Sequence, residues 1–195
     1  MARDRASREG ARSLRLFVAF EVSDEAKDAV EAAVAPLRER FPNARWVPRE
    51  NWHVTVKFLG QTYPRLVGWV QEQVMQAAVT SASVTSRLTE LGAFPSAGRA
   101  RVLWAGLDDR PGLLAEIALA LDAALAKEFK PETRAFSAHL TVARSDPPLR
   151  LPDGVAGAPL EPVDVTVDRL VLFRSHLRRP APFYEPLETF SLGTT

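Results

Sequence analysis

The chain has 195 residues, with 25 Lys and Arg against 24 Asp and Glu, no Cys and 46% hydrophobic residues. This composition is that of a globular protein, and the lack of Cys excludes a disulfide framework, a thiolate zinc site and a cysteine nucleophile. The formal charge of +1 excludes a strong overall field for binding polyanions. No stretch reaches the ~18 consecutive apolar residues of a membrane span, so we expect a cytoplasmic protein.

The N-terminal segment, residues 1–13, carries four arginines and is not followed by the apolar stretch of a signal peptide. We expect it to form a disordered basic arm, with a weak contact to RNA as the alternative. The first strand is predicted at residues 14–20, which are short, apolar and rich in strand formers.

Helices and strands are then predicted in alternation. The apolar periodicity, with Pro and Gly as boundaries, predicts helices at 24–40 (capped by Ser23), 64–78 and 111–129, and strands at 52–59, 84–91, 101–107, 138–143, 163–173 and 183–192. Gly60 is interpreted as a strand end, residues 92–98 as a turn, and the proline-rich residues 146–162 as a long irregular loop. This alternation favours an α/β or α+β sandwich.

Two parts of the sequence repeat at one fixed offset. Residues 15–19 resemble residues 101–105, which lie 86 positions later. The segments 53–56 (His-Val-Thr-Val) and 139–142 (His-Leu-Thr-Val) are also 86 positions apart. Each copy reads strand, helix, His-x-Thr-Val strand, which indicates a duplicated unit. A duplicated unit predicts two lobes related by a pseudo-two-fold axis, with the two motifs facing each other across a cleft.

The repeated motif carries the candidate chemistry. Residues i and i+2 project from the same face of a strand, so His53 lies beside Thr55 and His139 beside Thr141. One imidazole can act as the acid and the other as the base, and hydroxyls can donate to a phosphoryl anion. The simplest target for this set of groups is a phosphodiester that is cleaved by water.

Other types of site fit the sequence less well. Two histidines without a third ligand make a poor zinc site, so no metal is expected. No glycine-rich phosphate loop is present, so no nucleotide cofactor is expected. The third histidine, His176, is interpreted as a surface residue whose neighbouring arginines could contact phosphate.

At these residues the chain resembles the bacterial and archaeal RNA 2′,3′-cyclic phosphodiesterases, historically called 2′-5′ RNA ligases, of the two-histidine phosphoesterase superfamily. The likeness extends from Arg15 to about Leu192. It includes R-L-F-V-A-F at 15–20, R-W-V-P-x-E-N-W-H-V-T-V-K-F-L-G at 45–60 and H-L-T-V-A-R at 139–144.

The resemblance implies an α+β fold in which residues 14–195 form one bilobal domain. Its two pseudo-symmetric lobes would each have an antiparallel sheet and flanking helices around a central cleft. It also implies hydrolysis of an RNA 2′,3′-cyclic phosphate end, or of a small cyclic nucleotide, to a 2′-phosphomonoester without metal or ATP. We expect the protein to act as a monomer.

The resemblance also assigns roles to individual residues. His53 donates a proton to the leaving 3′-oxygen, His139 accepts one from the attacking water, and Thr55 and Thr141 hold the non-bridging oxygens. Arg144 matches a family arginine near the phosphate. However, its odd offset from His139 places its side chain on the opposite face unless the strand ends or bulges.

Two aromatic residues, Phe17 and Trp46, are candidates to stack on a base, with core packing as the alternative. Two other functions stay open. The same acid and base could join the cyclic end to a 5′-hydroxyl, or the cleft could bind RNA or nucleotides without turnover.

Overall fold

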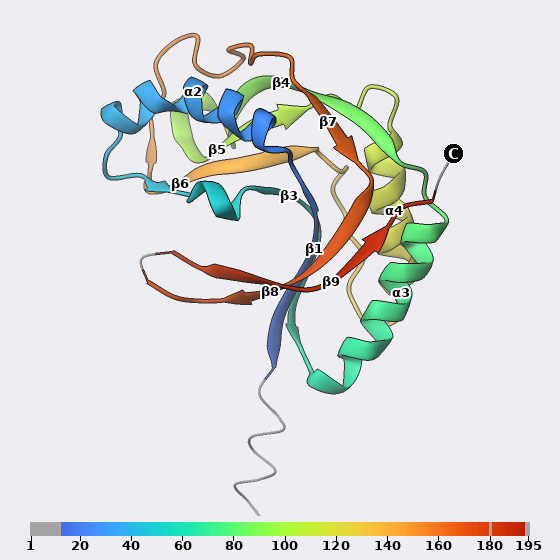
Figure 1. The fold of residues 1–195 in the computed structure, drawn as a ribbon. Coiled ribbons are helices and arrows are strands. Elements are labelled where there is room, and N and C mark those ends of the chain that lie inside the picture. Colours follow the sequence, from blue (N-terminus) through green and yellow to red (C-terminus); the bar gives the residue numbers. More distant parts are fainter. Residues whose placement is uncertain (1–12, 180, 194–195) are drawn as a thin grey trace, which may run out of the picture.

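Nine strands form one curled sheet in the computed structural model, which describes residues 13–179 and 181–193 (Figure 1). The strands are β1 (Leu14–Glu21), β2 (Arg45–Trp46), β3 (His53–Thr62), β4 (Val84–Phe94), β5 (Ala100–Leu107), β6 (His139–Leu149), β7 (Asp164–Val167), β8 (Arg169–His176) and β9 (Phe183–Ser191). The helices are α2 (Asp24–Arg40), α3 (Val67–Val79) and α4 (Leu113–Leu125), with short 3-10 turns η1 (Arg49–Asn51), η2 (Pro64–Leu66) and η3 (Ala97–Arg99). The α+β class is confirmed.

The sheet consists of two halves that meet at one residue pair. The order is β7-β4-β5-β6-β3-β1-β8-β9, with β2 added on β6, and all of these strand pairs are antiparallel. The halves join where Val54 of β3 pairs with Leu140 of β6. One half contains β1 and β3 and the other contains β5 and β6, so each half holds one copy of the repeat. The two His-x-Thr motifs therefore meet at the junction of the halves.

Strand β1 is buried on both faces. Leu16, Val18 and Phe20 point into the main core, while Phe17 and Ala19 belong to a small apolar cluster on the other face. This explains why the segment reads as a continuous apolar run rather than as a strict alternation. The second cluster is the one that lies beside the junction of the halves.

Helix α2 begins at the predicted cap and keeps the predicted apolar side. The Ser23 hydroxyl accepts a hydrogen bond from the backbone N–H of Ala26 at 3.3 Å, which satisfies one of the free donors of the first turn. Val30 and Val34 are fully buried, and Pro36 lies exposed within the helix without ending it. Figure 1 shows α2 on one side of the molecule and α3 with α4 on the other.

Three boundaries differ from the sequence prediction because of backbone pairing. Gly60 does not end β3: it adopts a φ of 64° where the register with β1 shifts, and the strand continues to Thr62. The turn predicted from Gly92 begins only after Phe94, since residues 92–94 pair with β5. Strand β6 continues to Leu149, so the first part of the predicted loop is extended.

The strand predicted at residues 163–173 is in fact two strands. Residues of β7 pair with β4, and residues of β8 pair with β1, so the chain passes from one half of the sheet to the other around Asp168. Both segments alternate, which is why periodicity alone cannot show the break.

Two further expectations concern membrane-spanning segments and the N-terminal arm. Within residues 13–179 and 181–193, no helix is long and apolar enough to cross a membrane. The basic arm predicted over residues 1–13 lies outside the described residues, except for Ser13.

Candidate active site

A bulge in β6 brings Arg144 to the face that carries the motif. Thr141 and Ala143 pair with consecutive residues of β5, so Val142 is an extra residue in the ladder. One extra residue reverses the alternation of side chains beyond it. Arg144, at an odd offset from His139, therefore lines the same pocket as Thr141.

The other copy of the motif contains the same bulge at the same place. Thr55 and Lys57 pair with consecutive residues of β1, which leaves Val56 as the extra residue. Phe58 consequently lines the pocket as well, and 55% of its surface is exposed. Phe58 and Arg144 are separated by the 86 positions of the repeat, so they are equivalent residues of the two halves.

The pocket lies at the junction of the halves and has a volume of about 380 Å³. Its walls are formed by Arg15, Leu16, Phe17, Val47, Asn51, His53, Thr55, Phe58, Thr141, Arg144, Ser175, Leu177, Pro182 and Tyr184. This set includes two arginines and no carboxylate, which favours an anionic ligand. The volume is near the lower end of the range of ~300–1,000 Å³ for small-molecule sites.

The ring of His53 is held by hydrogen bonds at both nitrogens. Nδ1 lies 2.8 Å from the carbonyl oxygen of Asn51, so Nδ1–H donates to it. Nε2 lies 3.0 Å from the Thr55 hydroxyl, which donates to Nε2 when the ring is neutral. The pair of bonds fixes which nitrogen is available for proton transfer.

Aromatic side chains bury His53. Phe17 stacks on its ring with centroids 4.8 Å apart, and Tyr184 approaches edge-on at 5.2 Å. The pKa of His53 is lowered to about 4, chiefly by burial. The hydrogen bond to the Asn51 carbonyl opposes the shift, and the positive charge of Arg144 contributes to it. The His53 ring is therefore neutral at neutral pH in the ligand-free protein.

His139 is anchored in the same way but has different surroundings. Its Nδ1–H donates to the carbonyl of Ser137 at 2.7 Å, and its ring meets the rings of Phe94 at 5.2 Å and Trp104 at 6.2 Å. Burial lowers its pKa, and the charge of Arg144 acts in the same direction. His139 is not part of the pocket wall, but the pairing of β3 with β6 brings its strand position next to Thr55.

A glycine makes room for the aromatic residues around His139. A Cβ atom on Gly92 would lie 2.1 Å from the Trp104 ring, so only glycine lets that ring lie against β4. Gly92 was interpreted from the sequence as part of a turn. The structure shows instead that its role is this close approach.

The predicted aromatic contacts separate into two cases. Phe17 lines the pocket and contacts His53. Trp46 lies outside the pocket wall: its Nε1–H donates to the carbonyl of Phe41 at 3.0 Å, and Arg38 lies over its ring. Sequence reasoning missed Asn51, Phe58 and Tyr184. Only Phe58 had a signal, which is its 86-residue offset from Arg144.

The described part of the chain contains no group of three or more His, Cys, Asp or Glu side chains arranged to hold a metal ion. The pocket offers the imidazole of His53, two hydroxyls and two arginines, and the imidazole of His139 lies next to it on β6. Both imidazoles have their Nδ1–H groups bound to the backbone. These groups can transfer protons to and from a bound phosphoryl group and neutralise charge on it.

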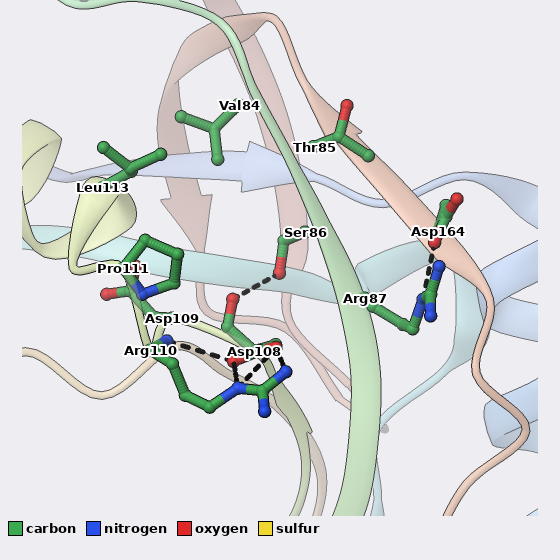
Figure 2. Close-up of a pocket in the computed structure, with 10 residues that line it drawn as sticks. All are labelled: Val84, Thr85, Ser86, Arg87, Asp108, Asp109, Arg110, Pro111, Leu113 and Asp164. Atoms are coloured by element: carbon green, nitrogen blue, oxygen red, sulfur yellow. Dashed lines mark hydrogen bonds and ion pairs between the residues drawn. The ribbon is translucent and has the colours of Figure 1, made fainter.

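A second pocket, of about 320 Å³, lies between β4, β7 and the start of α4 (Figure 2). Its charged side chains bind one another: Arg110 forms a two-pronged contact with Asp108, and Arg87 binds Asp164 at 2.7 Å. The carboxylate of Asp109 accepts hydrogen bonds from the first backbone N–H groups of α4. These charges are already neutralised, so the junction pocket is the better candidate for a reactive site.

Comparison with known proteins gives a family and several relatives. The family described as LigT like Phosphoesterase matches residues 20–104 and 107–184. A protein of Geobacillus stearothermophilus named RNA 2′,3′-cyclic phosphodiesterase is 27% identical over 179 residues, which are 90% of this chain. The chain spans only 56% of that protein's length.

A second relative with the same name, from Aeropyrum pernix, is 31% identical over 146 residues, which cover 72% of this chain and 82% of the relative. The crystal structure of TT0787 from Thermus thermophilus superimposes with a TM-score of 0.80 at 28% identity. That match covers 93% of this chain and 99% of the other.

Proposed function

The chain belongs to the LigT-like phosphoesterase family, and on this basis we propose that it hydrolyses the 2′,3′-cyclic phosphate ends of RNA to 2′-phosphomonoesters. The observation that carries the proposal is the meeting of two His-x-Thr motifs at one pocket that contains two arginines and no carboxylate. The names of the relatives support the substrate. An RNA substrate also favours a cytoplasmic location.

The proposed reaction is a single displacement at phosphorus. His139 accepts a proton from water through Nε2 as the water oxygen attacks, and the bond from phosphorus to the 3′-oxygen breaks. His53 delivers a proton from Nε2 to that oxygen, so the product carries a 3′-hydroxyl and a 2′-phosphate. Thr55, Thr141 and Arg144 donate to the non-bridging oxygens, where charge develops.

Both proton transfers use imidazoles of the chain itself, so the proposed reaction needs neither a metal ion nor ATP. The acid must carry its proton before the bond breaks, whereas the ligand-free His53 is neutral at neutral pH. A bound phosphodiester places a negative charge beside the ring, which raises the pKa of an imidazole. We therefore assign protonation of His53 to the substrate complex.

Phosphorus NMR tests the proposal. The purified protein is incubated with a short RNA that ends in a 2′,3′-cyclic phosphate, in EDTA and without ATP. We expect the cyclic phosphate signal to be replaced by that of a 2′-phosphomonoester. An unchanged signal, or a reaction that starts only when a divalent metal is restored, would contradict the proposal.

The same sample with an added RNA that has a 5′-hydroxyl end distinguishes hydrolysis from joining. We expect hydrolysis to dominate, because water at ~55 M outcompetes an acceptor that is not held in place. A 2′-5′ linked product that forms faster than the phosphomonoester would show that the joining reaction prevails.

A further inference from the structure

The β8–β9 hairpin forms part of the pocket wall. Figure 1 shows its end projecting from the sheet below β3. Ser175 and Leu177 on its first arm, and Pro182 and Tyr184 on its second, line the pocket. Arg178 and Arg179 directly follow Leu177, so the end of the hairpin adjoins the pocket wall.

The buried Asn51 connects the second arm of the hairpin to His53. The side-chain amide of Asn51 donates to the carbonyl of Pro182 at 2.7 Å, and the backbone carbonyl of Asn51 accepts from Nδ1 of His53. The hairpin is therefore fixed with respect to the catalytic ring, and a ligand bound to one has a defined position relative to the other.

The end of the hairpin is basic and aromatic. We use "hairpin tip" for Leu177, Arg178, Arg179 and Phe183. All four are exposed, and Leu177 is the most exposed large apolar side chain of the described residues at 76%. The guanidinium of Arg178 lies over the ring of Phe183 at 5.1 Å, which holds it in position while its N–H groups stay accessible.

Seven arginines of the described residues bind carboxylates, and the two arginines of the tip are not among them. Within the part of the chain that the structure describes, no carboxylate lies within ion-pair distance of Arg178 or Arg179. The nearest acidic residue on the hairpin, Glu185, is bound to His176 at 2.7 Å and lies 3.9 Å from Arg174. The charge of the tip is therefore available to a partner.

The size of the pocket requires a second contact region for a longer substrate. A volume of about 380 Å³ accommodates a small ligand such as a terminal nucleotide, and the preceding nucleotides must leave over the rim. Arg15 and Arg144 line the pocket, and the hairpin that forms part of its wall carries the exposed Arg178 and Arg179. Basic grooves with exposed aromatic rings are the usual surface for single-stranded nucleic acid.

We propose that the hairpin tip binds the phosphate backbone of single-stranded RNA immediately upstream of the terminal nucleotide, with Arg178 and Arg179 as the phosphate contacts. The inference rests on the proposed function and extends it: the preferred substrate is a polynucleotide rather than a free cyclic nucleotide. The formal charge of +1 agrees with a short, local contact of this kind.

The experiment compares two substrates with two double variants. Arg178→Ala/Arg179→Ala removes the charge of the tip, and Arg87→Ala/Arg110→Ala removes the same charge from the second pocket (Figure 2) as the matched control. The value of kcat/KM is measured for a short oligoribonucleotide that ends in a 2′,3′-cyclic phosphate and for a 2′,3′-cyclic mononucleotide.

We expect the tip variant to lose about tenfold in kcat/KM on the oligoribonucleotide, and to stay within about twofold of wild type on the mononucleotide. The salt dependence on the oligoribonucleotide should become shallower by a log–log slope of about 1.4, since each lost phosphate contact contributes ~0.7. The control variant should match wild type on both substrates. Equal losses on both substrates, or no loss on the oligoribonucleotide, would overturn the proposal.

Binding separates this inference from the proposed function. The affinity for a fluorescent oligoribonucleotide that ends in a 2′-phosphate is measured by anisotropy for the same variants. If wild type hydrolyses neither substrate, the proposed function fails, yet weaker binding by the tip variant alone still supports an RNA surface at the tip. If all variants bind equally, the tip proposal is wrong whatever the catalytic result.

Discussion

His53 and His139 come from the same short motif, yet the two rings lie in different surroundings. Both donate Nδ1–H to the carbonyl two residues earlier, at 2.8 and 2.7 Å. His53 also binds the hydroxyl of Thr55 and is covered by Phe17. His139 has aromatic edges as neighbours, and no hydrogen bond to Thr141 is found among the described residues.

The repeated motif and the side chains around it therefore control different properties of the two rings, namely their orientation and their pKa. The motif sets the orientation of each ring and leaves Nε2 as the nitrogen for proton transfer. The neighbouring side chains, which the repeat does not copy, set how strongly each ring holds a proton. Burial lowers the pKa of both rings, and the large shift, to about 4, belongs to His53. Acid–base catalysis needs one ring protonated and the other neutral. The low pKa of His53 favours its neutral form, so its proposed role as the acid depends on the charge of a bound phosphate.

The largest expected effect comes from removing either ring. His53→Ala and His139→Ala should each lower kcat/KM on an RNA 2′,3′-cyclic phosphate by about 10²–10⁴-fold, the usual contribution of a positioned acid or base. The kcat/KM of the double variant should be little lower than that of the less active single variant, because neither group works without the other. His176→Ala is the control with wild-type activity. Full activity in either single variant would remove the two-histidine mechanism.

The second comparison concerns Lys57, whose equivalent in the other half is Ala143. The side chain of Lys57 is 1% exposed, binds Asp122 of α4 and donates to the carbonyl of Lys130 at 2.8 Å. Asp122→Ala leaves this buried cation with only the more distant, exposed carboxylate of Glu132 at 3.8 Å, and should lower the free energy of unfolding by about 3 kcal/mol.

Urea denaturation measures this effect, with Asp164→Ala as the matched control. Asp164 binds Arg87 with both side chains 58% exposed, so its loss should change the free energy by only about 0–1 kcal/mol. If Asp122→Ala and Asp164→Ala lower the free energy of unfolding equally, the buried ion pair of Lys57 contributes no more to stability than an exposed one.

The third prediction is a pH dependence of stability caused by His53. Its pKa is about 4 in the folded chain against 6.5 for an ordinary histidine, so between these values the unfolded chain binds the extra proton. Stability should therefore fall by about 2–3 kcal/mol as the pH decreases from 6.5 to 4.

Urea midpoints at several pH values test this dependence in wild type and in His53→Gln. In His53→Gln, the fall in stability that His53 causes between pH 6.5 and 4 should be absent. In His176→Gln this fall should remain. Parallel curves for wild type and His53→Gln would mean that His53 is not held in its neutral form by burial.

The smallest predicted effect concerns the equivalent residues Phe58 and Arg144. Arg144 brings a positive charge into the pocket, whereas Phe58 offers an exposed ring suited to stacking on a base. Phe58→Ala should raise KM about tenfold with little change in kcat, since stacking contributes ~1–3 kcal/mol per base. Phe58→Tyr, which keeps the ring, should restore KM. An unchanged KM in Phe58→Ala would assign the ring to packing.

The sequence was sufficient for the features that depend on simple periodicity. The side chains of His53 and Thr55 share a face because strands alternate, and the same holds for His139 and Thr141. It was insufficient wherever the alternation breaks. The bulges at Val56 and Val142 turn the following residues toward the pocket, and nothing in a period of two marks them.

Long-range contacts set the remaining limits. The closeness of Gly92 to Trp104, and the bond from Asn51 to Pro182, join residues far apart in sequence. The break at Asp168, where the chain passes from one half of the sheet to the other, also depends on long-range pairing. Strands β7 and β8 have the same alternating pattern, and only their partners, β4 and β1, show that they are separate. Trp46 was predicted to stack on a base because it is aromatic. Its indole N–H instead donates to the Phe41 carbonyl, and its side chain lies outside the pocket wall.

The most direct measurement is an NMR titration of the histidine ring signals, without ligand and with a nucleoside 2′-monophosphate. In the free protein we expect His53 to titrate near 4, and the pKa of His139 to be lowered by burial from its ordinary value. The ligand should raise the pKa of both rings, because both lie at one bound phosphate. Equal pKa values in the free protein, or a ligand shift at only one ring, would contradict the division of roles between the two halves.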